Sequence, residues 1–126
     1  MASSTSTNAL RTILVNQFCD LLQVPDATKA LFGDQGHTID GVAKTALPDQ
    51  TELYNLLEEV DVDSLDITIE DYSVRVVGRL AVGVQNGATI SEFALSLNGE
   101  FIGVRNSAPK IKDADEEFTT SMLFIF

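Results

Sequence analysis

Residues 90–104 read ISEFALSLNGEFIGV, and this stretch decides the fold. Its centre is Asn98-Gly99, a pair that favours positive φ at both central positions of a two-residue turn. Runs rich in apolar residues flank the pair on both sides, as is typical of β-strands with a buried face. The stretch therefore predicts a β-hairpin with strands over 90–97 and 100–105.

Further strands are predicted on either side of this hairpin. Residues 65–70 alternate apolar and polar side chains, which predicts a strand with one face in water. A second alternating run covers 74–84, where internal glycines indicate a bulge or bend, and Asn86-Gly87 then turns the chain back. A lysine-bearing loop leads to a closing strand over 117–126, and no helix fits after Val60.

Helices are predicted in the first half of the chain. Apolar residues recur at helical spacing from Asn8, a good N-cap, up to Pro25, and predict an amphipathic helix. A short second helix is expected over 26–31, and a third, amphipathic helix over 48–60. Residues 1–7 are small, polar and uncharged, apart from the initial methionine, and we expect a flexible or docked N-terminal arm there.

Together these elements predict the α+β class. An N-terminal helical segment would precede an antiparallel β-sheet or sandwich of about five strands. With 126 residues the chain has the length of one ordinary domain. We therefore expect a single domain over 8–126, mainly helical over 8–60 and antiparallel β over 61–126.

The composition indicates a chain that folds and disfavours several classes of partner. Hydrophobic residues make up 44% and charged residues 21%, as in ordinary globular proteins. The formal net charge of −11 repels nucleic-acid phosphates and anionic lipid, so we expect neither nucleic acid nor a membrane as a partner. The opening residues lack the pattern of a signal peptide, and the single cysteine cannot form an internal disulfide. We expect synthesis in a reducing cytoplasm.

No group of residues has the pattern of a catalytic, cofactor or metal site. The acidic stretch over 61–66 resembles a calcium loop, but Asp66 stands where glycine is needed and Tyr72 where a bidentate glutamate belongs. His37, the only histidine, has no flanking motif, and we interpret it as a surface residue of a loop. Cys19 lies beside Phe18 on the apolar side of the first helix and is expected to be buried and inert. We expect no enzyme activity and no cofactor.

The second half of the chain resembles a module that recurs in phage tail-fibre and related virion structural proteins. The resemblance is carried by Ile90-Ser-Glu, the turn at Asn98-Gly99 with its return strand, the lysine-bearing loop over 108–115 and the closing strand over 117–126. It covers about residues 49–126, with Ala94 where the family usually has glycine and Ser96 where it usually has an aromatic residue. Members of this family are structural parts of fibres, baseplates or virion surfaces and generally act as oligomers.

The resemblance implies that the chain works by assembly within a phage particle made in a bacterial host. The expected function is that of a tail-side component, in the fibre, baseplate or an adaptor, which forms a homo-oligomer and attaches to neighbouring phage structural proteins. A capsid decoration protein is one alternative. A host-surface carbohydrate-binding module is another, disfavoured because the chain has no Trp and only two Tyr for sugar stacking.

Large apolar side chains are the candidates for an interface, because each contributes about 1.5–3 kcal/mol when buried. The closing strand ends on five consecutive apolar residues, which belong either to a central strand or to a subunit interface. The first helix supplies further candidates if it packs between subunits. The candidate interface residues are Leu10, Leu14, Phe18, Phe101, Phe124 and Phe126.

Overall fold

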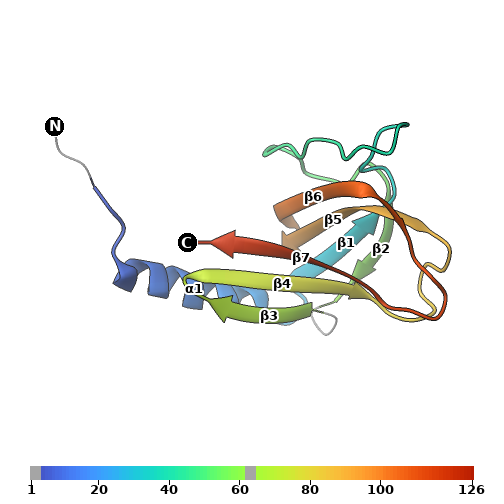
Figure 1. Ribbon diagram of the computed structural model, residues 1–126. Coiled ribbons are helices and arrows are strands. Elements are labelled where there is room, and N and C mark those ends of the chain that lie inside the picture. Colours follow the sequence, from blue (N-terminus) through green and yellow to red (C-terminus); the bar gives the residue numbers. More distant parts are fainter. Residues whose placement is uncertain (1–3, 62–64) are drawn as a thin grey trace.

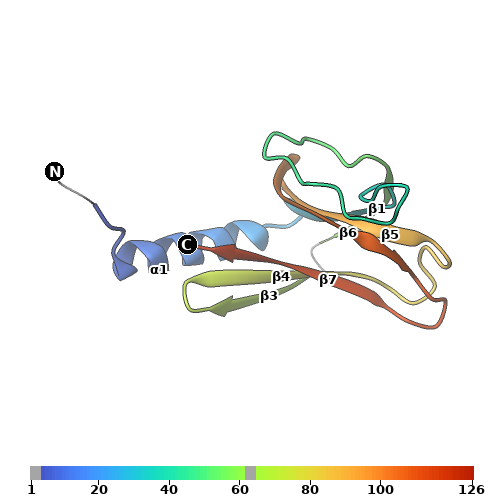
Figure 2. The same ribbon diagram turned by 45° about the horizontal axis from the view of Figure 1, so that its top comes forward.

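A computed structural model describes residues 4–61 and 65–126 of the chain. Within them, one helix precedes seven strands: α1 (Asn8–Leu22), β1 (Thr28–Gly33), β2 (Leu56–Val60), β3 (Leu65–Glu70), β4 (Ser73–Leu80), β5 (Thr89–Leu97), β6 (Glu100–Ile111) and β7 (Phe118–Ile125). The strands form two antiparallel sheets, ordered β2-β1-β5-β6 and β3-β4-β7, which lie one above the other (Figure 1, Figure 2). This arrangement is compatible with the expected α+β class but has more strands than the five expected.

The predicted hairpin is confirmed. Strands β5 and β6 pair antiparallel up to Leu97 and Glu100, and the two residues between them have the positive φ that the turn requires, 52° at Asn98 and 85° at Gly99. The strand expected over 65–70 is also confirmed as β3, which pairs along its whole length with β4. The run over 74–84 forms a strand only as far as Leu80, since residues 81–88 turn back toward β5.

The core lies between the two sheets. Val74, Val76 and Leu80 of β4 are fully buried, and they share one hydrophobic cluster with Phe32 of β1 and Phe93 of β5. A Cβ atom at Gly78 would lie 2.7 Å from the ring of Phe93, so the absence of a side chain there allows the sheets to approach closely.

Two of the predicted helices are wrong. Residues 28–33 form β1, because Thr28, Ala30 and Phe32 point to one side of a strand and all three are buried. Residues 56–60 form β2, an edge strand paired with β1, and residues 34–55 form a long connection that lies over the outer face of the first sheet (Figure 2). The expectation of a mainly helical segment over 8–60 therefore holds only for α1.

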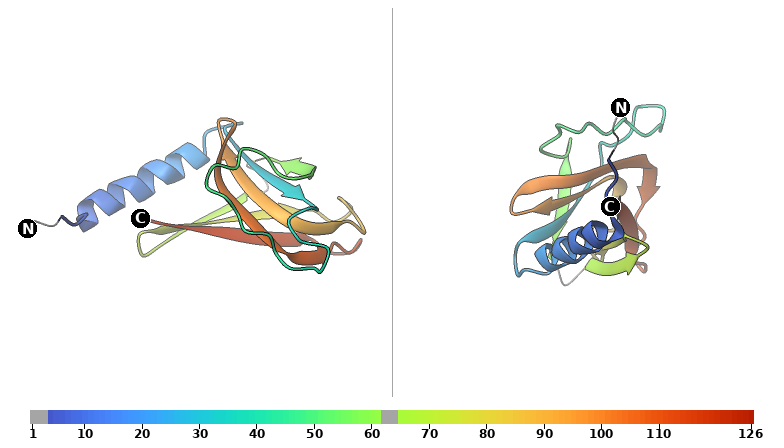
Figure 3. Two further views of the ribbon diagram at one scale, coloured as in Figure 1. Left: turned by 90° about the horizontal axis from the view of Figure 1, so that it is seen from above. Right: turned by 90° about the vertical axis from the view of Figure 1, so that its left-hand side faces the viewer.

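Helix α1 is confirmed, with a different cap. The side chain of Thr7, not Asn8, accepts a hydrogen bond from the backbone N–H of Leu10 at 3.3 Å, and the helix ends at Leu22, before Pro25 as expected. The N-terminal end of α1 points away from the sandwich, and the C-terminus of the chain lies beside the helix (Figure 3). The arm expected over 1–7 lies partly outside the described residues, since the structure describes it only from residue 4.

Candidate functional site

An aromatic cluster anchors α1 to the sandwich. The ring of Phe18 lies 4.9 Å from that of Phe124 and 5.4 Å from that of Phe126, measured between centroids. Arg11 adds a polar contact, since its Nε donates a hydrogen bond to the carbonyl oxygen of Phe126 at 2.6 Å and its guanidinium covers the ring of Tyr72. Three of the six candidate interface residues thus pack together within one subunit.

The other three candidates lie elsewhere. Leu10 and Leu14 are 44% and 38% exposed on α1, whereas Phe18 is half-buried. Phe101 is half-buried on β6, where it lines shallow hollows together with Thr51 of the long connection. The structure therefore packs Phe18, Phe124 and Phe126 together, while Leu10 and Leu14 are exposed and Phe101 lies on another strand.

A second apolar face of α1 is open to solvent. We call it the outer helix face; its apolar members are each between 38% and 52% exposed, and they are Leu10, Ile13, Leu14, Leu21 and Val24. At about 100° per residue, this face lies about 155° around the helix from the buried face of Val15, Cys19 and Leu22. The helix itself contains only two charged residues, Arg11 and Asp20. A helix that is apolar on two sides is typical of one that is buried on both.

The outer helix face is also hollowed at its C-terminal half. Gln17, Asp20, Leu21 and Val24 line an open hollow. Val24 follows the C-cap Gln23, whose backbone is still in the right-handed helical region, so the hollow extends two residues past the end of α1.

A buried carboxylate clamps the long connection over 34–55 onto β5. Glu92 is 1% exposed, and its Oε1 accepts a hydrogen bond from the backbone N–H of Tyr54 at 2.6 Å. Its Oε2 accepts from the backbone N–H groups of Gln35 and Asn55, both at 3.1 Å. The sequence offered no signal for this role, because the three donors belong to the backbone and lie far from Glu92 along the chain.

Ser91 completes the clamp. Its hydroxyl is 2.8 Å from both the backbone N–H of Gly36 and Nδ1 of His37. His37 is therefore half-buried and bonded, not a free surface residue as the sequence suggested. Ser91 is itself 1% exposed, so its hydroxyl is out of reach of a substrate.

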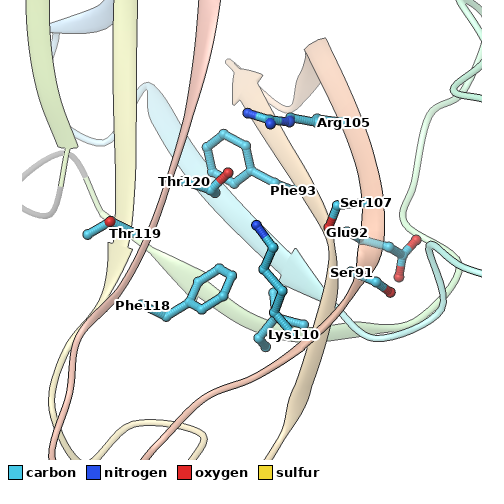
Figure 4. Close-up of a pocket in the computed structure, with 10 residues that line it drawn as sticks. Ser91, Glu92, Phe93, Arg105, Ser107, Lys110, Phe118, Thr119 and Thr120 are labelled. Atoms are coloured by element: carbon cyan, nitrogen blue, oxygen red, sulfur yellow. The ribbon is translucent and has the colours of Figure 1, made fainter. Parts of the chain in front are cut away.

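A small polar cavity lies between β5, β6 and β7 (Figure 4). Its volume of about 30 Å³ suits about one water molecule, far below the size of a pocket for an organic ligand. Arg105 and Lys110 point toward it, while the carboxylate of Glu92 points away toward the long connection (Figure 4). The two cations therefore surround a space that is too small for a substrate.

Two residues of the acidic stretch over 61–66 form ion pairs, each with a cation of a different sheet. Asp61 pairs with Lys29 of β1, a hydrogen bond that raises the pKa of Lys29, and Asp66 pairs with Arg79 of β4. Asp63 lies outside the described residues. Among residues 4–61 and 65–126, no group of three or more His, Cys, Asp or Glu side chains is placed to hold a metal ion.

Both tyrosines have a cation against the ring. Lys44 Nζ lies 4.2 Å from the ring centroid of Tyr54, and the Arg11 guanidinium lies at the same distance from that of Tyr72. One face of each ring is therefore occupied, which weakens the case for sugar-stacking platforms.

Comparison with known proteins gives no match, neither to a family model nor to a curated protein. In the part of the chain that the structure describes, no helix has both the length and the apolar character to cross a membrane.

Proposed function

We propose that this chain is a non-enzymatic structural protein of a bacteriophage particle, a tail-side component that acts by forming a homo-oligomer and attaching to neighbouring phage proteins. The observation that carries the proposal is the outer helix face. It holds five large apolar residues in solvent, four on α1 and Val24 just past its end, while the opposite side of the helix is already packed against its own sandwich. Exposed apolar surface of this kind is costly in water and is typical of protein interfaces.

The resemblance of residues 49–126 to virion structural proteins supports the assignment to a phage particle. One motif of the resemblance is Ile90-Ser-Glu, and the two polar residues of this motif are the ones that clamp the long connection in place. A clamped connection gives a surface of defined shape, which suits attachment to a neighbour.

The clamped connection is the second surface that we assign to attachment. It carries exposed apolar side chains along its length, with Ile39 fully exposed at the turn between Thr38 and Gly41. Val42, Leu47 and Tyr54 are each at least half exposed. This surface and the outer helix face lie on different elements, so one could bind copies of the same chain while the other binds a different virion protein.

Localisation in the particle tests the proposal. Antibodies against the purified chain, with gold labels, should decorate the tail end of intact particles of the encoding phage. Labels over the capsid shell would favour the decoration protein instead. Particles that carry none of this protein would contradict the proposal in both forms.

A further inference from the structure

The spacing of the outer helix face is that of a coiled-coil seam. Its central residues are Leu10, Leu14, Gln17 and Leu21 of α1 and Val24, two residues past the end of the helix, separated by steps of four, three, four and three. Such steps average 3.5 residues, the period that keeps two helices in contact along a left-handed supercoil.

The residues that line the hollow on this face have the spacing of those that form a hole in a coiled coil. A knob from a facing helix enters a space bounded by four residues, and on a single helix these stand at i, i+3, i+4 and i+7. Gln17, Asp20, Leu21 and Val24 have this spacing, and they line the open hollow on α1. The receiving surface for a second helix is therefore already formed in one subunit.

Charge favours a second copy of the same helix as the occupant. The chain carries a formal net charge of −11, so any contact between two copies meets strong repulsion over most of the surface. Helix α1 has one cation and one anion, which cancel, and no charge on the seam except Asp20 at its margin. The outer helix face thus carries one charge per copy, that of Asp20, against −11 for the whole chain, so repulsion between copies is weak there.

We infer that α1 packs against α1 of a second copy through this seam, with Gln17 as its central polar layer. The inference rests on the proposed function and names the surface by which the copies join. Gln17 is the midpoint of the five seam positions, so it faces its counterpart whether the two helices run parallel or antiparallel. A single polar residue in an apolar seam favours one register over its alternatives, at a cost in stability.

Cross-linking at position 17 tests the inference in the full chain. In a background with Cys19→Ala, the variant Gln17→Cys should form a disulfide-linked dimer under mild oxidation, because seam residues of facing helices come within disulfide distance. The matched control is Asn16→Cys, an exposed neighbour on the polar side of the same helix, which should remain largely unlinked. Thermal unfolding of both variants verifies that each is folded.

The outcomes separate this inference from the proposed function. Preferential linking at position 17 supports the seam. Equal or weaker linking at 17 than at 16, in a chain that sediments as an oligomer, would overturn the seam and leave the assembly proposal standing on another surface. A chain that sediments only as a monomer would overturn both.

Discussion

At the scale of single residues, Glu92 illustrates how one side chain organises a whole connection. Replacing it with alanine removes the acceptor of three backbone N–H groups, and we expect the free energy of unfolding to fall by about 2–4 kcal/mol. The amides of Gln35, Tyr54 and Asn55 should then exchange with solvent much faster, as read by hydrogen exchange. Glu100→Ala, at an exposed carboxylate, is the control; equal exchange in the two variants would mean that the clamp is unimportant.

Cys19 gives a second prediction at this scale. Burial, with a smaller contribution from the charge of Asp20, raises the pKa of the Cys19 thiol above its ordinary value. A thiol whose pKa is higher in the folded state stabilises the fold below its unfolded pKa, and this contribution is lost as pH rises through the higher folded pKa.

We therefore expect Cys19 of the folded chain to react slowly with thiol reagents at neutral pH, and the fold to weaken as pH rises beyond about 8.5. Labelling followed by mass spectrometry, with and without denaturant, measures the first effect. A Cys19→Ala variant should show a smaller loss of stability at high pH than the parent chain. Rapid labelling of the native chain would show that the thiol is accessible.

At the scale of elements, Phe124 has a different expected role from the one that its place in the closing strand suggested. It packs on Phe18 within the subunit, so Phe124→Ala should lower the free energy of unfolding by about 2–4 kcal/mol and loosen α1. Leu123→Ala, on the opposite and exposed side of β7, should cost less than about 1 kcal/mol. Denaturant titration compares the two, and similar losses would contradict the assigned packing.

Replacing the central polar residue of the seam should strengthen it. Gln17→Leu buries an apolar side chain where an amide stood, and we expect self-association about tenfold tighter or more, with a less uniform oligomer. Sedimentation velocity measures both the affinity and the spread of species. Asn16→Leu, on the polar side, serves as the control; a similar gain there would indicate unspecific hydrophobic association.

Which elements could be predicted depended on how local their determinants are. The hairpin at Asn98-Gly99 needs only its own turn chemistry, and β3 shows its alternation within six residues, so both were predictable. Residues 28–33 and 56–60 carry side chains that suit a helix as well as a strand. They become β1 and β2 because of pairing with β5 and with each other, a tertiary effect that propensity does not contain.

The candidate site was predictable only in part for the same reason. The helical spacing of Leu10, Leu14 and Phe18 predicts an amphipathic helix. Which side of α1 faces its own sandwich depends on Phe124 and Phe126 at the other end of the chain. The clamp of Ser91 and Glu92 depends on backbone donors of the long connection, and backbone donors leave no trace in a sequence pattern.

At the scale of the whole molecule, the net charge should govern how strongly the copies associate. Repulsion between chains of charge −11 opposes assembly, and salt screens it, since the Debye length falls from about 30 Å at 0.01 M to about 8 Å at 0.15 M ionic strength. We expect self-association to tighten as salt is raised over this range. Light scattering at fixed protein concentration measures it, and weaker association at higher salt would indicate an interface built on ion pairs instead.

Sedimentation equilibrium of the full chain beside its Leu14→Glu variant tests the central claim most directly, that α1 joins copies through its outer face. Leu14 is on that face and 38% exposed, so a carboxylate there should leave the fold intact while charging the seam. The parent chain should sediment at a multiple of 13.6 kDa at micromolar concentration, and the variant close to 13.6 kDa. The claim would be contradicted if the parent chain remained at 13.6 kDa at concentrations up to about 1 mM, since association weaker than that is negligible. It would also be contradicted if the variant assembled as the parent does.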